Sequence, residues 1–107
     1  MNAATLKRVN WRAALVVDGQ APILAKVQQA NAMQFVLLCQ QELRIADQFT
    51  IFVDVLDAAR KNHDYITAKV KVSGSVLVGG MFRCIVKVSQ IESNQLSQLN
   101  RLLELVH

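Results

Sequence analysis

Apolar and polar residues alternate with a period of two along most of this 107-residue chain. The alternation is typical of strands with one buried face, because successive side chains of a strand point to opposite sides of a sheet. It predicts six strands, over residues 13–17, 23–27, 35–39, 49–56, 65–78 and 82–91. The third of these is apolar at every position, which predicts a strand that is covered on both faces.

The two longest predicted strands flank Gly79-Gly80-Met81 and form a hairpin. A two-residue turn would mix lysines and valines on each face, so we predict a three-residue connection that pairs Val78 with Phe82. This register places an apolar set on the inner face: Val70, Val72, Val76, Cys84, Val86 and Val88. It places a polar set outside: Lys69, Lys71, Ser73, Ser75, Arg83, Lys87 and Ser89. The hairpin is therefore predicted to be a basic ribbon that faces solvent.

A helix is predicted over residues 93–106, after the hairpin. Ser93 is its predicted N-cap, and leucines at Leu96, Leu99, Leu102 and Leu103 recur at helical spacing. The leucine stripe either covers the core or binds a partner, which leaves self-association open.

Six strands and one helix in so short a chain predict one mainly-β domain over residues 1–107. We expect a small antiparallel barrel with a C-terminal α-helix, since closing the sheet removes its exposed edges. Residues 1–12 are expected to form an N-terminal arm, residues 13–91 the barrel and residues 93–106 the helix.

Composition narrows the class of protein. Hydrophobic residues make up 52% of the chain and charged residues 19%, which excludes a disordered chain. No apolar run approaches the roughly 18 residues of a membrane span, and no signal sequence is apparent, so we expect a cytoplasmic domain. The net charge of +4 is ordinary for a small domain, so the position of the cations matters more than their number.

No residue pattern favours catalysis or a metal centre. His63 lies in a charged turn and His107 is the last residue, and neither has a second ligand or a nucleophile at a suitable spacing. Cys39 and Cys84 both lie in apolar strands, where buried, inert thiols are expected. We therefore predict a protein that is not an enzyme, with no catalytic residue, metal or cofactor.

Arg8 and Arg12 stand four residues apart, just before the first predicted strand. Two guanidinium groups at this spacing can converge on one phosphorylated ligand, because arginine binds phosphate in a bidentate manner and stacks on bases. Trp11 lies between them and is either a further stacking surface or an anchor in the core.

Arg8-x-x-x-Arg12 ahead of a six-stranded barrel with a terminal helix resembles the PilZ domain family, and the resemblance covers nearly the whole chain. The hairpin around residues 78–82 is similar to that family's last pair of strands. The resemblance implies a bacterial receptor for cyclic di-GMP that passes the signal to a protein partner. It also implies that Arg8 and Arg12 contact the phosphates and stack on the guanines.

The family's second motif, Asp/Asn-x-Ser-x-x-Gly, reads the guanine. In the corresponding stretch of this chain, Gln28, Ala30 and Met33 stand at the three motif positions. Gln28 can still form hydrogen bonds, and Asn31 lies in the same stretch, so both are candidate residues of a degenerate second motif. Ala30 has no hydroxyl, and Met33 carries a Cβ where the turn would favour a glycine.

Two alternatives stay open beside a cyclic-di-GMP-responsive adaptor. A PilZ-like module that has lost nucleotide binding would act through protein contacts alone, for example in pilus or motility control. A basic barrel could instead bind single-stranded nucleic acid through Lys69, Lys71, Arg83 and Lys87. We disfavour nucleic acid as a partner, because this ribbon has no interleaved aromatic residues on which bases could stack.

Overall fold

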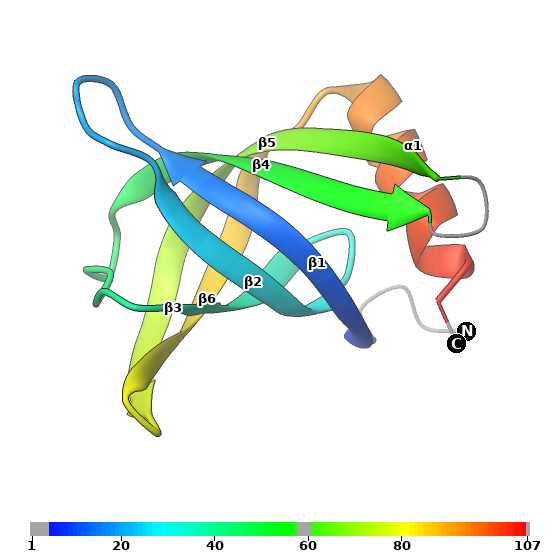
Figure 1. Cartoon of the computed structure of the whole chain (residues 1–107). Helices are drawn as coiled ribbons and strands as arrows, with labels where there is room; N and C mark the ends of the chain where they lie inside the picture. The colour runs from blue at the N-terminus through cyan, green and yellow to red at the C-terminus, as the bar shows by residue number, and fades with distance from the viewer. Residues whose placement is uncertain (1–4, 58–60, 107) are drawn as a thin grey trace.

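In the computed structural model, six antiparallel strands form a closed barrel with one helix at its end (Figure 1). The structure describes residues 5–57 and 61–106. The strands are β1 (Lys7–Val16), β2 (Ile23–Ala30), β3 (Gln34–Cys39), β4 (Gln48–Asp57), β5 (Asn62–Val78) and β6 (Met81–Gln90), and the helix is α1 (Ser93–Glu104). Around the barrel the order is β1-β2-β3-β6-β5-β4, and pairing of β1 with β4 closes the sheet. The predicted small antiparallel six-stranded barrel with a C-terminal helix is confirmed.

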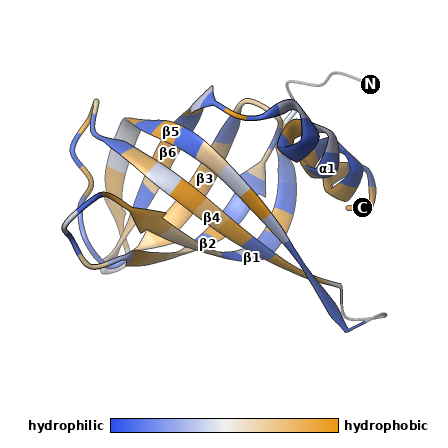
Figure 2. Ribbon diagram, turned by 90° about the horizontal axis from the view of Figure 1, so that it is seen from above, coloured by the Kyte–Doolittle hydropathy of each residue, from blue (hydrophilic) through white to orange (hydrophobic). Residues whose placement is uncertain are grey.

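Closure gives every strand an inward face, and the alternation of residues fills that face with apolar side chains. Hydrophobic and hydrophilic positions alternate along the strands in Figure 2. The largest fully buried side chains include Leu15, Val27, Phe35, Leu37, Ile51, Val53, Ile66, Val70, Val72, Val86 and Leu99. Full burial of such a side chain contributes about 1.5–3 kcal/mol, so this interior is the main source of stability.

The first strand begins well before its predicted start at residue 13. Because β1 runs from Lys7, the arginines Arg8 and Arg12 lie within a strand and not in an arm ahead of it. Trp11 is 8% exposed and belongs to the core cluster, so it is a core anchor and not a stacking surface. Trp11 points inward, and Val9, two residues before it, is partly buried. The alternation of inward and outward residues therefore continues toward the N-terminus.

The turn of the β5–β6 hairpin differs from the prediction. It has two residues, Gly79 and Gly80, with Val78 opposite Met81, so the predicted pairing of Val78 with Phe82 is wrong. Both glycines have positive φ, 59° and 84°. This kind of two-residue hairpin turn requires positive φ at both positions, and the twist of the turn then matches the twist of the strands.

A bulge between Val72 and Gly74 reconciles this turn with the hydrophobic pattern. It shifts the pairing by one residue, so that Val72 lies opposite Val86. The burial of both residues was predicted, but their pairing was not. Between the bulge and the turn, residues of β5 that were predicted on the inner face lie on the outer face, and the reverse. Val76, predicted to face inward, is 62% exposed, whereas Ser75 lies opposite buried Cys84.

Helix α1 covers one end of the barrel. Its Leu99, Leu102 and Leu103 are buried in the core cluster, so these residues of the leucine stripe form a core-covering face. The N-cap residue is Glu92 and not Ser93, and no side chain caps the helix. Lys7 Nζ donates a 2.8 Å hydrogen bond to the carbonyl oxygen of Leu103, where a cation is favourable to the helix end. No helix in the described residues is long and apolar enough to cross a membrane.

The two hairpin glycines generate a prediction about stability. Gly80→Ala should lower the free energy of unfolding by about 1–2 kcal/mol, because a side chain is strained at positive φ even in open space. Gly74→Ala is the matched control, since its φ is not in the left-handed region and an added Cβ would only touch Ile85 Cδ1 at 4.0 Å. Urea denaturation should show that the control is at least as stable as the wild type. Equal losses in the two variants would contradict the prediction.

Candidate functional site

Arg8 lies at an open groove of about 570 Å³ on the outside of the barrel. The groove crosses β1, β2, β3 and β6, which are consecutive neighbours in the sheet. Register shifts in the β1–β2 and β2–β3 pairs lie beside it, and such bulges bend strands locally. Val36 and Ile85 give the groove an apolar lining, and Val36 is only 7% exposed although it lies on the outer side of β3.

Three cations line this groove, which we call the Arg8 groove. They are Arg8 on β1, Lys26 on β2 and Arg83 on β6. None of the described residues that line the groove is acidic. Uncompensated positive charge beside an apolar surface fits a ligand that carries both phosphate and a flat ring system.

Arg83 is the site residue that sequence reasoning missed. The alternation of apolar and polar residues along its strand assigned Arg83 to the solvent-facing ribbon, and the residue is indeed exposed. The pairing of β3 with β6, in which Leu38 lies opposite Arg83, brings it to the same groove as Arg8. No local sequence signal reports this pairing, because the two strands are far apart in the chain.

The two candidate residues of the second motif have different environments. Gln28 lines the Arg8 groove, together with Gln29 and Gln34, so amide groups stand beside the cations. Asn31 is 4% exposed, and its Oδ1 accepts hydrogen bonds from the backbone N–H groups of Met33 and Gln34, at 2.7 and 2.8 Å. The Asn31 side chain therefore stabilises the β2–β3 turn. Met33 is not among the residues with positive φ, so this turn forms without a glycine.

Arg12 lines a neighbouring groove of about 520 Å³, which we call the Arg12 groove. In the sheet Arg12 lies between Lys26 on one side and Asp54 on the other. Asp54 Oδ1 is 2.6 Å from His63 Nδ1, and the His63 ring stacks on Tyr65 with 6.0 Å between centroids. Asn10 and Lys26 line both grooves, so Arg8 and Arg12 occupy adjoining parts of one outer surface.

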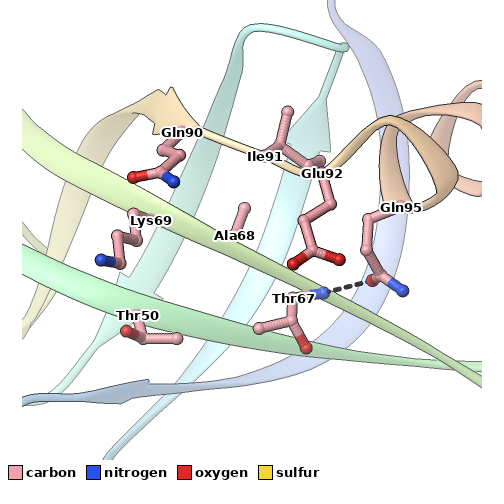
Figure 3. Close-up of a pocket in the computed structure, with 8 residues that line it drawn as sticks. All are labelled: Thr50, Thr67, Ala68, Lys69, Gln90, Ile91, Glu92 and Gln95. Carbon is pink, nitrogen blue, oxygen red and sulfur yellow. Dashed lines mark hydrogen bonds between the residues drawn. The ribbon is translucent and has the colours of Figure 1, made fainter.

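A further hollow of about 350 Å³ lies between α1 and β5 (Figure 3). Its polar groups hold the helix on the barrel: Gln95 Oε1 accepts the backbone N–H of Thr67 at 2.7 Å. One turn later, Gln98 Nε2 donates to Asp64 Oδ1 at 3.2 Å. Lys69 and Glu92 line the hollow with opposite charges, so it lacks the one-sided electrostatics of the Arg8 groove.

The two cysteines lie together inside the barrel, with 3.6 Å between their sulfur atoms. Burial raises the pKa of the Cys39 thiol from its ordinary 9.0 to about 12, with a smaller contribution from Cys84. A thiol with so high a pKa is a poor nucleophile at neutral pH. In the described part of the chain, which excludes His107, no group of three His, Cys, Asp or Glu residues could hold a metal ion.

The Cys39 thiol makes stability depend on alkaline pH. Below pH 9 the thiol is protonated in both the folded and the unfolded chain, so its full contribution to the free energy of unfolding is present. Above pH 9 the unfolded chain loses the proton first, so the free energy of unfolding should fall, by up to about 1.4 kcal/mol per pH unit. Urea denaturation between pH 7 and 10 should show a steeper fall for the wild type than for Cys39→Ala. Parallel curves for the two proteins would contradict this assignment.

Comparison with known proteins identifies a shared fold but no family. No protein-family model matches the chain, and no curated protein matches its sequence. A solved structure from Bacillus subtilis, described as the inhibitor of motility MotI/DgrA, superposes with a TM-score of 0.78 at 7% sequence identity. The match covers 92% of this chain and 47% of that protein, so the chain spans about half the neighbour's length. At this identity the similarity shows a shared fold.

Proposed function

We propose that this chain is a PilZ-type adaptor that responds to cyclic di-GMP and passes the signal to a protein partner in the cytoplasm, without enzymatic activity. The observation that carries the proposal is the Arg8 groove, where three cations, several amide side chains and the apolar side chains of Val36 and Ile85 lie together without an acidic residue. A cyclic dinucleotide has two phosphates and two flat bases, which are the groups that such a lining complements.

In this proposal each part of the surface has a distinct role. Arg8, Lys26 and Arg83 would neutralise a phosphate, and the apolar side chains of the groove would contact the face of a guanine. Gln28 would offer amide hydrogen bonds to the edge of that base. Arg12, in the adjoining Arg12 groove, would contact the second half of the ligand.

A protein-interaction module without nucleotide binding is the second candidate. It is favoured by the second motif, where Ala30 lacks a hydroxyl and Asn31 Oδ1 is engaged by the turn. A base contact of this kind is worth about 1–3 kcal/mol, so its loss would weaken binding roughly ten- to hundredfold. The shared fold with a motility inhibitor is consistent with both candidates, and it supports an output through protein contacts in motility control.

Isothermal titration with cyclic di-GMP tests the adaptor proposal. The wild type should bind saturably, and Arg8→Ala or Arg12→Ala should weaken binding by roughly tenfold or more, since a hydrogen bond to a charged group is worth about 1.5–3 kcal/mol. Arg83→Ala should have a comparable effect through the Arg8 groove. Lys71→Ala is the matched control, because Lys71 is an exposed cation that lines neither groove.

Two results would overturn nucleotide binding at this surface. One is the absence of heat at millimolar cyclic di-GMP with a folded wild-type protein, which would leave the interaction module as the function. The other is equal weakening by Lys71→Ala and Arg8→Ala, which would indicate attraction to the net positive charge and not a site.

A further inference from the structure

The β5–β6 hairpin projects from the barrel, and one edge of β5 is unpaired there (Figure 1). Pairing of β4 with β5 ends at Lys71, which lies opposite Gln48. The backbone of Val72 then bonds to Asp47 and Ala46 of the preceding loop, at 2.9 Å each. Beyond this point β6 pairs with residues 74–78 on one side, and no described strand pairs with them on the other.

The geometry of the turn indicates which backbone groups face the open edge. In a two-residue hairpin the residues that flank the turn, here Val78 and Met81, bond to each other through their backbone groups. The direction of backbone groups alternates along a strand, so Ser75 and Leu77 direct their N–H and C=O groups away from β6. Residues 74–78 therefore present a short row of donors and acceptors about 17 Å long.

Beyond the bulge between Val72 and Gly74, this edge has no further protection against another strand. Proteins commonly protect an edge with a lysine, a proline or a covering element. Residues 74–78 contain neither a charge nor a proline. Val76 is exposed, as are Leu77 and Val78, and Leu77 has 63% of its surface accessible. Ile45, 69% exposed, lies next to Ala46 at the inner end of the edge. An apolar, unprotected edge of this kind suits the addition of a strand from another protein.

Charge indicates what kind of strand fits. Residues 65–91 contain four cations and no acidic residue. Lys71 and Lys87 lie directly opposite each other and are both exposed, an arrangement of like charges that destabilises a sheet. Arg83 lies opposite Val76, immediately behind the open edge. A second copy of the hairpin would add the same positive charge, whereas an acidic segment would neutralise it.

We propose that residues 74–78 accept an extended, acidic segment of a partner protein as an added β-strand. Its main chain bonds to Ser75 and Leu77, and alternate side chains place carboxylates toward Lys71 and Arg83. The remaining side chains of the segment pack against Leu77. The proposal deepens the adaptor function by naming the partner surface, and it rests on that function only for its role in signalling.

Nuclear magnetic resonance with a defined probe tests this surface without any nucleotide. The probe is an end-capped heptapeptide of alternating Glu and Val, and the control peptide has Lys in place of Glu. The acidic peptide should shift the amide signals of residues 74–78 and slow hydrogen exchange at the amides of Ser75 and Leu77. The lysine peptide should bind at least tenfold more weakly, because it repels the hairpin.

Variants separate strand addition from simple apolar contact. Leu77→Pro removes an edge N–H that does not bond to β6 and should abolish the shifts. Leu77→Ala keeps this N–H and should still bind, weakened only by the lost contact with the Leu77 side chain. Val76→Glu is a second test that leaves the backbone intact, since this exposed position tolerates charge. It should weaken binding of the acidic peptide, because the new carboxylate repels the carboxylates of the peptide.

Four outcomes would overturn the proposal: no shift at millimolar peptide, shifts outside the hairpin, equal binding of the two peptides, or full binding by a folded Leu77→Pro protein. Self-association through residues 74–78 without peptide would also overturn it, in favour of a second copy as the occupant. Since no nucleotide is present, failure here leaves the titration with cyclic di-GMP unaffected.

Discussion

The pairing of β1 with β4 is the constraint on which the rest of this structure depends. It closes the sheet, so every strand residue is assigned either to a filled interior or to the outer surface. The interior accepts the apolar half of the alternation, and Trp11 anchors the start of β1 within it. The polar half of β1, including Arg8 and Arg12, is thereby held on the outside of a rigid sheet. Apart from Leu6, the residues that line the Arg8 groove and the Arg12 groove thus take their positions from strands.

The length of β5 is the one departure from simple closure. This strand has 17 residues, whereas β4 and β6 each have 10, so both neighbours cannot cover it throughout. Near its start, the segment that β6 leaves free is covered by α1, whose Gln95 accepts the N–H of Thr67. Near its end, the segment that β4 leaves free is uncovered beyond Val72. The fold therefore covers one overhang with its own helix and leaves the other open.

Strand β6 links the two surfaces that we propose to be functional. Arg83 lines the Arg8 groove and is also the direct neighbour of Val76, which lies on the open edge of β5. A ligand that orders the Arg83 side chain would change the charge and shape presented behind that edge. In the proposed function, this adjacency would connect a nucleotide in the Arg8 groove with a partner at the open edge, through one side chain and one pair of strands.

The hairpin shows where sequence reasoning succeeds and where it stops. The alternation of Val70, Val72 and Val86 correctly predicted their inward faces, because burial of one face is a strong local constraint. The prediction for Val76 was wrong, since the bulge beside Gly74 exchanges the faces of the residues that follow. A bulge adds one residue without changing composition, so periodicity alone does not reveal it. The strand predicted at residues 13–17 was wrong at its start for a different reason. Val9, Trp11 and Ala13 continue the alternation toward the N-terminus, with Arg8 and Arg12 on the polar face, so the signal for a longer strand was present in the sequence.

The sequence by itself determined the strands, the terminal helix and the pair Arg8 and Arg12, because each is a pattern among residues close together in the chain. Tertiary structure alone decided what surrounds those arginines. Pairing of β3 with β6 brings Arg83 to the Arg8 groove, and the β2–β3 turn engages Asn31 Oδ1. The first of these contacts depends on which strands are neighbours, and the second depends on the conformation of a turn. The alternation of residue types predicts neither strand neighbours nor turn conformation.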